Sequence, residues 1–261
     1  MADTPMLALR GINKSFGAVH VLRDVDFNVY PGEVMALVGD NGAGKTTLIK
    51  CLAGIYPIDS GEFLLDGKRI HIHGPRDAAA YGIEFVYQDL ALCDNLDIVQ
   101  NMFLGRELRT RPFRVLDEGA MERRARETLA SLSVRTIQSV RQVVSSLSGG
   151  QRQTVAIAKA VLWENRVIVL DEPTAALGVA QTKQVLDLVR RLADAGHGVV
   201  LISHNMNDVM QVADRITAMY LGRVAAEVRA ADVTHSQVVE LITAGRSGEL
   251  GLQPAEAAQS A

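Results

Sequence analysis

The segment GDNGAGKT, which begins at Gly39, has residue types and spacing that suit phosphate binding. It matches the pattern G-x-x-x-x-G-K-[S/T]. Glycines at Gly39, Gly42 and Gly44 let backbone N–H groups curl around phosphate oxygens. Lys45 adds a positive charge, and the Thr46 hydroxyl suits Mg²⁺. The predicted binding segment also includes Asp40, Asn41, Ala43 and Thr47.

Two adjacent acids could complete a site that cleaves a phosphoanhydride. Asp171 and Glu172 follow the apolar run VIVL. A carboxylate at the end of such a strand can hold Mg²⁺, and a second can orient a water or take its proton. If the glycine-rich loop were not present, two acids at the end of a strand would more ordinarily be interpreted as a solvent-exposed pair. With the glycine-rich loop present, we expect Asp171 at the metal and Glu172 as the general base.

A second candidate anion site lies in the sequence LSGGQ. The residues after it, RQTVAIAKAVL, have a helical pattern. A serine and two glycines at a helix start leave backbone N–H groups and a positive dipole end open to an anion. The candidates are Ser148, Gly149, Gly150 and Gln151. One chain therefore carries two phosphate-binding segments, and the second needs a ligand of its own.

Short apolar runs that alternate with helical segments separate these candidates. We expect helices at 45–53, 179–195 and 208–212, strands at 33–38, 63–65, 83–86, 167–170 and 199–202, and a hairpin of 215–220 with 223–228. Such alternation favours an α/β fold with a largely parallel sheet. The mostly helical stretch of about 90–162 interrupts it and predicts a separate lobe. The small, polar segment 245–261 predicts a poorly ordered, flexible tail.

Composition fits one globular domain without a nucleic-acid partner. The 261 residues are 48% hydrophobic and carry a net charge of −3, which gives no basic footprint. Cys51 and Cys93 form no metal-binding pattern and are expected to be free thiols. The N-terminus lacks a signal-peptide pattern, and no apolar run approaches the ~18 residues of a spanning helix. We expect a cytosolic protein.

The motifs occur in the order typical of ATP-binding-cassette (ABC) ATPases. Gln88 in VYQD and His204 in LISH complete that order, and the chain resembles the family from about Leu7 to Ala244. The resemblance implies a P-loop NTPase core with an antiparallel β part and an inserted helical subdomain at about 90–162, all within an ABC ATPase domain at 5–244. It implies hydrolysis of ATP with Mg²⁺.

The resemblance assigns further roles to single residues. Gln88 matches the glutamine that senses Mg²⁺ and the attacking water, and His204 matches the histidine that contacts the γ-phosphate. Phe16, in KSFG, matches the aromatic residue that stacks on adenine. From the residues alone, a histidine after an apolar strand is more often structural, and a phenylalanine near an N-terminus is more often part of a core.

The family arrangement gives the second anion site a ligand. Two cassettes face head to tail, and the LSGGQ turn of one covers the γ-phosphate held by the other. Ser148 and Gly150 are the residues expected at that phosphate. The implied partners are a second copy of the chain, a membrane permease and, indirectly, a periplasmic sugar-binding protein. The protein would then lie on the cytoplasmic face of the inner membrane.

Within the family, the chain resembles ATPase subunits of bacterial sugar importers of the ribose, xylose and fructose branch, in a single-cassette form. The stretches that carry this likeness are GDNGAGKTTLIKCLAGIYPIDSGEFLLDG, GIEFVYQDLALCDNLDIVQNMFLGRE and LDEPTAALGVAQT. Gly178 replaces the aspartate that usually ends the segment after the catalytic glutamate, a change often seen in this branch. The alternatives are another ABC importer or exporter class and a non-transport ABC ATPase.

The segment 106–126 is rich in arginine. It holds seven arginines against four acids, a local net charge of +3. One interpretation is a solvated helical face. The other is a face near the permease or anionic lipid headgroups, because the segment lies just beyond Gln88, where the resembling family docks its permease.

Overall fold

The central sheet of the computed structural model, which describes residues 4–110, 112–134, 136–163, 165–248 and 250, has the strand order β10-β9-β3-β8-β7-β6. The strands are β3 (Val34–Gly39), β6 (Ile83–Val86), β7 (Val167–Asp171), β8 (Gly198–Ile202), β9 (Arg215–Tyr220) and β10 (Arg223–Arg229). All neighbours pair in parallel except β10, which runs antiparallel to β9. The predicted α/β class with a largely parallel sheet is confirmed.

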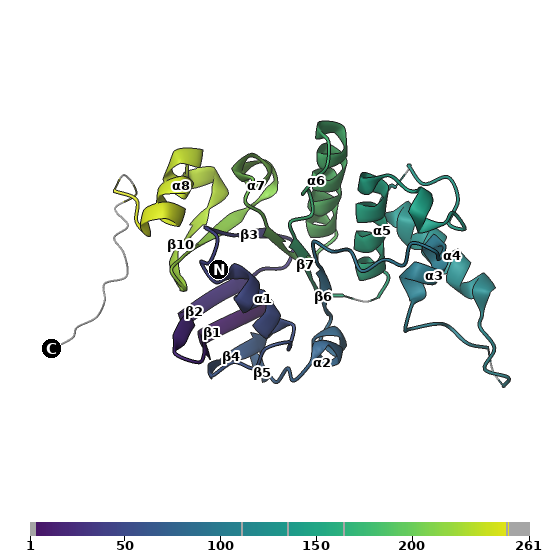
Figure 1. Ribbon diagram of the computed structural model, residues 1–261, viewed down its shortest axis with the longest axis horizontal. Helices are drawn as coiled ribbons and strands as arrows, with labels where there is room; N and C mark the ends of the chain where they lie inside the picture. The colour runs from purple at the N-terminus through teal and green to yellow at the C-terminus, as the bar shows by residue number, and fades with distance from the viewer. Residues whose placement is uncertain (1–3, 111, 135, 164, 249, 251–261) are drawn as a thin grey trace.

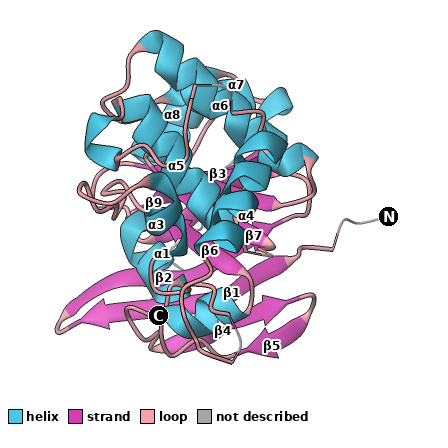
Figure 2. Ribbon diagram, turned by 90° about the vertical axis from the view of Figure 1, so that its right-hand side faces the viewer, coloured by secondary structure: helices cyan, strands magenta, loops and turns pink. Residues whose placement is uncertain are grey.

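A second, antiparallel sheet covers one face of the molecule (Figure 2). Its order is β2-β1-β4-β5, with β1 (Leu7–Phe16), β2 (Val19–Val29), β4 (Ser60–Leu65) and β5 (Lys68–Ile70). The long hairpin of β1 and β2 is irregular, with three shifts of register between Leu9 and Ser15. This sheet is the antiparallel part that the sequence predicted.

Helices fill the remaining layers (Figure 1). They are α1 (Lys45–Leu52), α2 (Pro75–Ala80), α3 (Ile98–Phe103), α4 (Glu118–Ser131), α5 (Gly149–Val161), α6 (Val179–Asp194), α7 (Met206–Val212) and α8 (His235–Ala244), with short 3₁₀ turns at Val144–Ser146 and Ala230–Asp232. Figure 1 places α6, α7 and α8 above the central sheet, and α1 and the antiparallel sheet below it.

The central strands are buried on both faces, which is why they read as continuous apolar runs. In β7, Val167 and Val169 pack with the antiparallel sheet and α1, whereas Ile168 and Leu170 pack with α5 and α6. Successive side chains of a strand point to opposite faces, so one short strand serves two cores. The sheet is therefore held rigidly at its carboxyl edge, where the candidate residues lie.

The stretch 90–162 forms the helical end of the molecule, at the right of Figure 1. Its described residues contain α3, α4 and α5 and no strand longer than an isolated bridge. One hydrophobic cluster runs from Met121 of α4 through Val155 of α5 to Ile168 of the sheet. The helical end thus shares its core with the sheet, and its division as a subdomain stays a prediction.

The start of the predicted C-terminal tail packs against the domain. Gly245 ends α8 with a left-handed φ of 69°, the Ser247 side chain is buried, and Leu250 packs beside α8. The rest of the predicted tail, residues 249 and 251–261, lies outside the described residues.

Candidate functional site

Most of the predicted site residues meet at the carboxyl edge of the central sheet. The pairing of Leu37 with Ile202, and of Ile202 with Asp171, aligns the ends of β3, β8 and β7. The pairing of Val86 with Leu170 brings the end of β6 to the same edge. This edge is where open α/β sheets hold their ligands.

The glycine-rich loop leads from β3 into α1. Gly44 is the N-cap of α1 and has a φ of 102°, a left-handed conformation that favours glycine. A Cβ atom there would lie 2.9 Å from a methyl carbon of Leu22. An open hollow of about 400 Å³, within the range of small-molecule sites, is lined by Val21 and residues 41–47. The loop therefore presents the N-terminus of α1 to an accessible space.

Lys45 extends back across this loop. Its ammonium group donates to the carbonyl of Gly39 at 2.6 Å and to that of Asp40 at 3.1 Å. Burial lowers the pKa of Lys45, and the negative charges of Glu172 and other nearby carboxylates oppose that shift. The ammonium group is thus held, partly desolvated, beside the loop and the acids.

The two acids occupy the end of β7. Burial first, and then the charge of Glu172, raise the pKa of Asp171, while Lys45 opposes the shift. Glu172 has a φ of 50°, which is uncommon for a residue other than glycine. Its N–H donates to Ile202 at 2.9 Å, and its carboxylate lies 2.9 Å from Nδ1 of His204. The structure therefore brings together Lys45, Asp171, Glu172 and His204.

A residue that the sequence analysis missed supports this turn. The Thr174 hydroxyl donates to a carboxylate oxygen of Asp208 at 2.6 Å, and Asp208 is buried on α7. The contact ties the segment after Glu172 to the helix that follows His204. The sequence contains no signal for it, because an acid in the first turn of a helix ordinarily serves the helix end.

Gln88 and Phe16 lie at two margins of the site. Gln88 is exposed on the loop two residues after β6, next to the strand that ends in Asp171. Phe16, at the end of β1, is 42% exposed and makes an edge contact with Tyr56 at 5.0 Å between ring centroids. Phe16 is therefore not a core residue, and the Lys14 ammonium group lies over its ring, 5.3 Å from the ring centroid. Tyr56 is a second aromatic candidate that the sequence analysis did not single out.

The LSGGQ turn lies apart from these residues, at the start of α5 in the helical end. Ser148 caps the helix: its hydroxyl accepts from the Gln151 N–H at 3.4 Å, and its N–H donates to the Gln151 side chain at 2.8 Å. The Gln151 amide also donates to the Thr136 carbonyl at 2.7 Å. Ser148 and Gly149 are exposed, so the helix start can receive a group from outside the chain.

The two glycines of this turn permit close packing against the start of α6. A Cβ at Gly149 would lie 3.3 Å from Leu177, and one at Gly150 would lie 3.1 Å from Gln181. The turn is therefore in contact with the segment that carries Gly178. In the family that the sequence resembles, this segment usually ends in an aspartate that couples the two nucleotide sites of a dimer.

We expect Gly178→Asp to fold normally and to change the free energy of unfolding by only a few tenths of a kcal/mol, in the stabilising direction. Gly178 has a φ of −74° and is the N-cap of α6, a position that aspartate favours. The nearest atom to a Cβ there is 4.0 Å away. Urea unfolding of the two proteins measures the difference. A loss of more than about 1 kcal/mol would contradict this account of the backbone.

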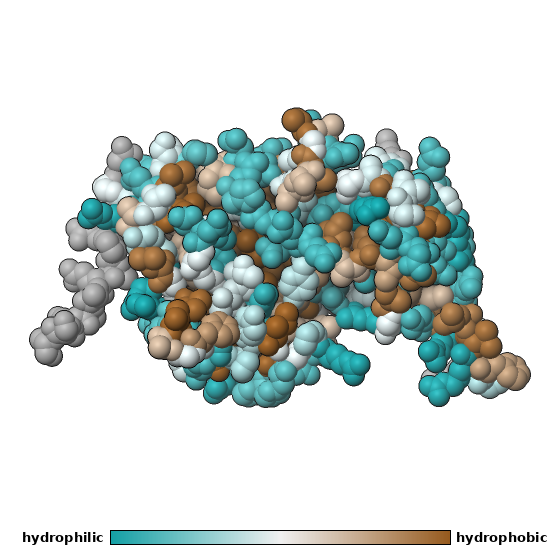
Figure 3. All heavy atoms as spheres, viewed as in Figure 1, coloured by the Kyte–Doolittle hydropathy of each residue, from teal (hydrophilic) through white to brown (hydrophobic). Residues whose placement is uncertain are grey.

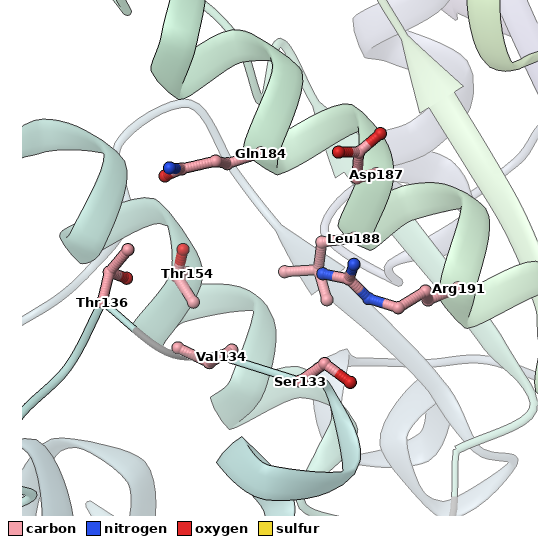
Figure 4. Close-up of a pocket in the computed structure, with 8 residues that line it drawn as sticks. All are labelled: Ser133, Val134, Thr136, Thr154, Gln184, Asp187, Leu188 and Arg191. Atoms are coloured by element: carbon pink, nitrogen blue, oxygen red, sulfur yellow. The ribbon is translucent and has the colours of Figure 1, made fainter.

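A pocket behind the turn is separate from the predicted site (Figure 4). Its walls come from α6, from Thr154 of α5 and from the loop that includes Ser133 and Thr136. None of the predicted site residues lines it. Two of its lining residues contact the LSGGQ turn: the Thr136 carbonyl accepts from the Gln151 amide, and the Thr154 hydroxyl donates to the Gly150 carbonyl at 2.8 Å.

Known proteins resemble this chain over nearly its whole length. A model of the family described as ABC transporter matches residues 22–175. The fructose import ATP-binding protein FrcA of Rhizobium meliloti is 47% identical over 251 residues, which cover 94% of this chain and 96% of FrcA. The xylose/arabinose import ATP-binding protein XylG of Sulfolobus acidocaldarius is 41% identical over 247 residues, which cover 95% of this chain and 97% of XylG.

A solved structure shares the fold. The crystal structure of a nucleotide-free ATP-binding cassette from an ABC transporter superimposes with a TM-score of 0.79, covering 92% of this chain and 96% of that chain. The sequence identity is 24%, so this likeness concerns the fold alone. The predicted P-loop NTPase core of this type is confirmed.

Proposed function

Because the chain belongs to the ABC transporter family, we propose that it is the ATP-hydrolysing subunit of an importer that carries a sugar through a separate membrane permease. FrcA and XylG, which bear the names of sugar import proteins, match 94% and 95% of this chain. The observation that carries the proposal is the convergence of Lys45, Asp171, Glu172 and His204 at one edge of the sheet.

The residues at this edge fit a nucleotide and Mg²⁺. The loop from Gly39 to Thr47 would hold the phosphates, and Phe16, supported by its edge contact with Tyr56, would stack on the base. Among the described residues, no group of three His, Cys, Asp or Glu side chains is arranged to bind a metal. Mg²⁺ commonly binds through one or two carboxylates and the substrate's own phosphates. The oxygens of Thr46, Gln88 and Asp171 suit that mode, and the ion would neutralise phosphate charge.

Hydrolysis would depend on positioning and charge. Glu172 would act as general base toward the attacking water, since its backbone N–H is held by the Ile202 carbonyl and its carboxylate lies 2.9 Å from Nδ1 of His204. His204, which is 75% exposed, would contact the γ-phosphate. Lys45 would stabilise charge at the β- and γ-phosphates.

The exposed LSGGQ turn would serve a second copy of the chain. Its open helix start is in the helical end, whereas the glycine-rich loop lies on the other side of the central strands (Figure 1). In a head-to-tail pair, Ser148 and Gly150 of one copy would reach the γ-phosphate held by the other. Each ATP would then be enclosed by two chains, and closure of the pair would drive transport.

A groove beside Gln88 suits a docking segment of the permease. It lies between the end of β6, α3 and α5, and Tyr87, Leu90, Leu104, Arg106, Lys159 and Trp163 are among its lining residues. Arg106 pairs with Glu84 at 2.7 Å and lies over the Trp163 ring. Burial lowers the pKa of Lys159, whose ammonium group faces this partly apolar groove. The loop that carries Gln88 forms one wall of the groove. A permease segment bound there could therefore displace Gln88 relative to the nucleotide site.

This role would place the protein at the cytoplasmic face of the cell membrane. None of the described helices combines the length and the apolar character needed to cross a bilayer. The permease would hold the chain at the membrane, and the sugar would be selected by the permease and a periplasmic binding protein.

Copurification with a permease tests the proposal as a whole. The chain, purified from its native membranes under mild detergent, should retain a membrane-spanning partner and hydrolyse ATP. After reconstitution in vesicles, one sugar with its binding protein should stimulate hydrolysis above that of other solutes. Recovery of an active ATPase from the membranes with no membrane-spanning partner, and with no sugar that stimulates it, would instead favour the non-transport alternative.

Leu104→Arg should separate docking from hydrolysis. Leu104 is 43% exposed at the groove, so a long cation there would obstruct a docked segment without disturbing the core. We expect at least a tenfold loss of copurified permease and unchanged basal hydrolysis by the isolated chain. Leu221→Arg is the matched control, because Leu221 is 68% exposed on the distant turn between β9 and β10. Equal permease recovery from both variants would contradict the assigned groove.

A further inference from the structure

A hairpin protrudes from the helical end between α3 and α4 (Figure 1). Its arms are joined by hydrogen bonds from Thr110 N–H to the Val115 carbonyl and from Asp117 N–H to the Leu108 carbonyl, each 2.9 Å long. An isolated bridge pairs Arg109 with Leu116. The hairpin therefore presents a defined surface; Arg111, one of the seven arginines counted in this segment, lies outside the described residues.

The tip of this hairpin exposes the apolar side chains of Phe113 and Val115, whereas Leu116, nearer the base, also lines a hollow with residues of α3 and α4. Phe113 is 84% exposed, Val115 62% and Leu116 47%. Figure 3 shows brown atoms gathered where the hairpin protrudes, at the lower right. Single exposed apolar residues are ordinary, whereas a cluster of them on one projection indicates a contact surface.

The charge on the same projection is positive. The stretch LRTRPFRVL, residues 108–116, contains no acid. Arg109 and Arg114 are exposed, and neither forms a salt bridge with a described residue. At the base, Glu107 accepts from the Gly105 N–H and Asp117 from the Ala120 N–H, each at 2.9 Å. The Gly105 N–H and, less strongly, the charge of Arg109 lower the pKa of Glu107, but neither Arg109 nor Arg114 is in ion-pair contact with a described acid, so both can meet an anionic partner.

We propose that the tip docks on anionic phospholipid headgroups, with Phe113 at the level of the headgroups and Arg109 and Arg114 paired with lipid phosphates. Arginine binds phosphate in two-pronged geometry, and aromatic rings favour the membrane interface. The combination of exposed cations, no acid in residues 108–116 and an exposed aromatic ring is complementary to an anionic membrane surface. The lipid would supply the negative charge that the hairpin itself lacks.

The hairpin's location rests on the proposed function. It starts at Leu104 and Arg106, which also line the proposed permease groove. A permease seated in that groove would hold the tip beside the bilayer. The lipid contact and the permease contact would then together set the distance and tilt of the chain relative to the membrane.

Vesicle binding by the full chain tests the proposal. The probe is cosedimentation with vesicles of phosphatidylglycerol and phosphatidylcholine in equal parts, compared with phosphatidylcholine alone, at low and high salt. We expect salt-sensitive binding to the anionic vesicles only. Arg109→Gln with Arg114→Gln should lower the affinity about 30-fold, because each arginine contributes about fivefold at an anionic surface. Phe113→Ser should lower it about tenfold.

Matched controls lie on the hairpin of β9 and β10, at the opposite end of the molecule in Figure 1. Leu221→Ser, and Arg223→Gln with Arg229→Gln, remove the same kinds of side chain and should bind vesicles like the wild type. Phe113→Trp adds a reporter at the tip, and its emission should shift to the blue with anionic vesicles. Leu221→Trp should show no such shift.

Each other result overturns the lipid proposal. Absence of wild-type binding to anionic vesicles does so, as does binding that the tip variants leave unchanged. If the tip variants instead lose permease in detergent while vesicle binding persists, the tip contacts protein. Hydrolysis by the isolated tip variants should equal that of the wild type, so failure of lipid docking leaves the proposed ATPase role standing, and Leu104→Arg tests the permease role separately.

Discussion

The Lys45→Ala variant is expected to show no detectable ATP hydrolysis and weaker nucleotide binding. Lys45 supplies the one side-chain cation within the described glycine-rich loop, and its ammonium group is held by the carbonyls of Gly39 and Asp40. It is also the positive charge that offsets Asp171, whose pKa is raised by burial and by Glu172. Without the Lys45 ammonium group, the negative charges of the phosphates would be repelled more strongly by the carboxylates of Asp171 and Glu172.

Steady-state phosphate release and equilibrium nucleotide binding measure the two effects. Lys183→Ala is the matched control, since Lys183 is exposed on α6 away from the loop and should hydrolyse ATP like the wild type. Thermal melting of both variants checks that the fold survives. If Lys45→Ala retained more than half of the wild-type rate, the assignment of the phosphate site would be wrong.

The phosphate loop and the strand-end acids could be predicted because their signals are local. A glycine pattern and an apolar run that ends in acids each fall within a few residues. Parallel strands then place their carboxyl ends at one edge, so Asp171, Glu172 and His204 could be expected together. The contact of Thr174 with Asp208 could not be predicted, since it joins residues 34 apart along the chain through tertiary packing.

The central strands were predicted within about one residue, as at Val167–Asp171, because continuous burial gives an unbroken apolar run. The hairpin of β1 and β2 was not delimited in advance, since its three register shifts break the alternation of apolar and polar residues. Helix α8 was also not assigned. Its capping box, Thr234 with Gln237, is visible in the sequence and would have indicated where that helix begins.

Gly178 shows how the structure settles a question of backbone geometry that sequence leaves open. A glycine can mark either a left-handed conformation or a tolerated small side chain. Its φ of −74° excludes the first reason. The glycines of the neighbouring turn differ, because Gly150 is packed against Gln181. Glycine is thus required for close contact in the LSGGQ turn but not at the start of α6.

Glu172→Gln is expected to lower the hydrolysis rate about 10²–10⁴-fold while nucleotide binding persists. The substitution keeps the shape of the side chain and its approach to His204, 2.9 Å away, but removes the proton acceptor. Asp171, Thr46 and Lys45 remain to hold the nucleotide. If the LSGGQ turn of one copy closes on the ATP of another, unconsumed ATP should hold the pair together. Size exclusion with light scattering should show a shift from monomer toward dimer with ATP.

Substitutions at Ser148 in the Glu172→Gln background should reverse that shift, since Ser148 is exposed and, in the proposed pair, would contact the γ-phosphate held by the other copy. Ser148→Arg blocks the turn by size but also removes a helix cap. Ser148→Asp keeps the capping oxygen and opposes the γ-phosphate by charge, so its effect does not depend on helix stability. Ser131→Arg, on the exposed end of α4, is the control and should leave the dimer intact. Equal dimerisation of the Ser148→Asp and control proteins, with ATP bound to both, would mean that the two chains do not share the nucleotide.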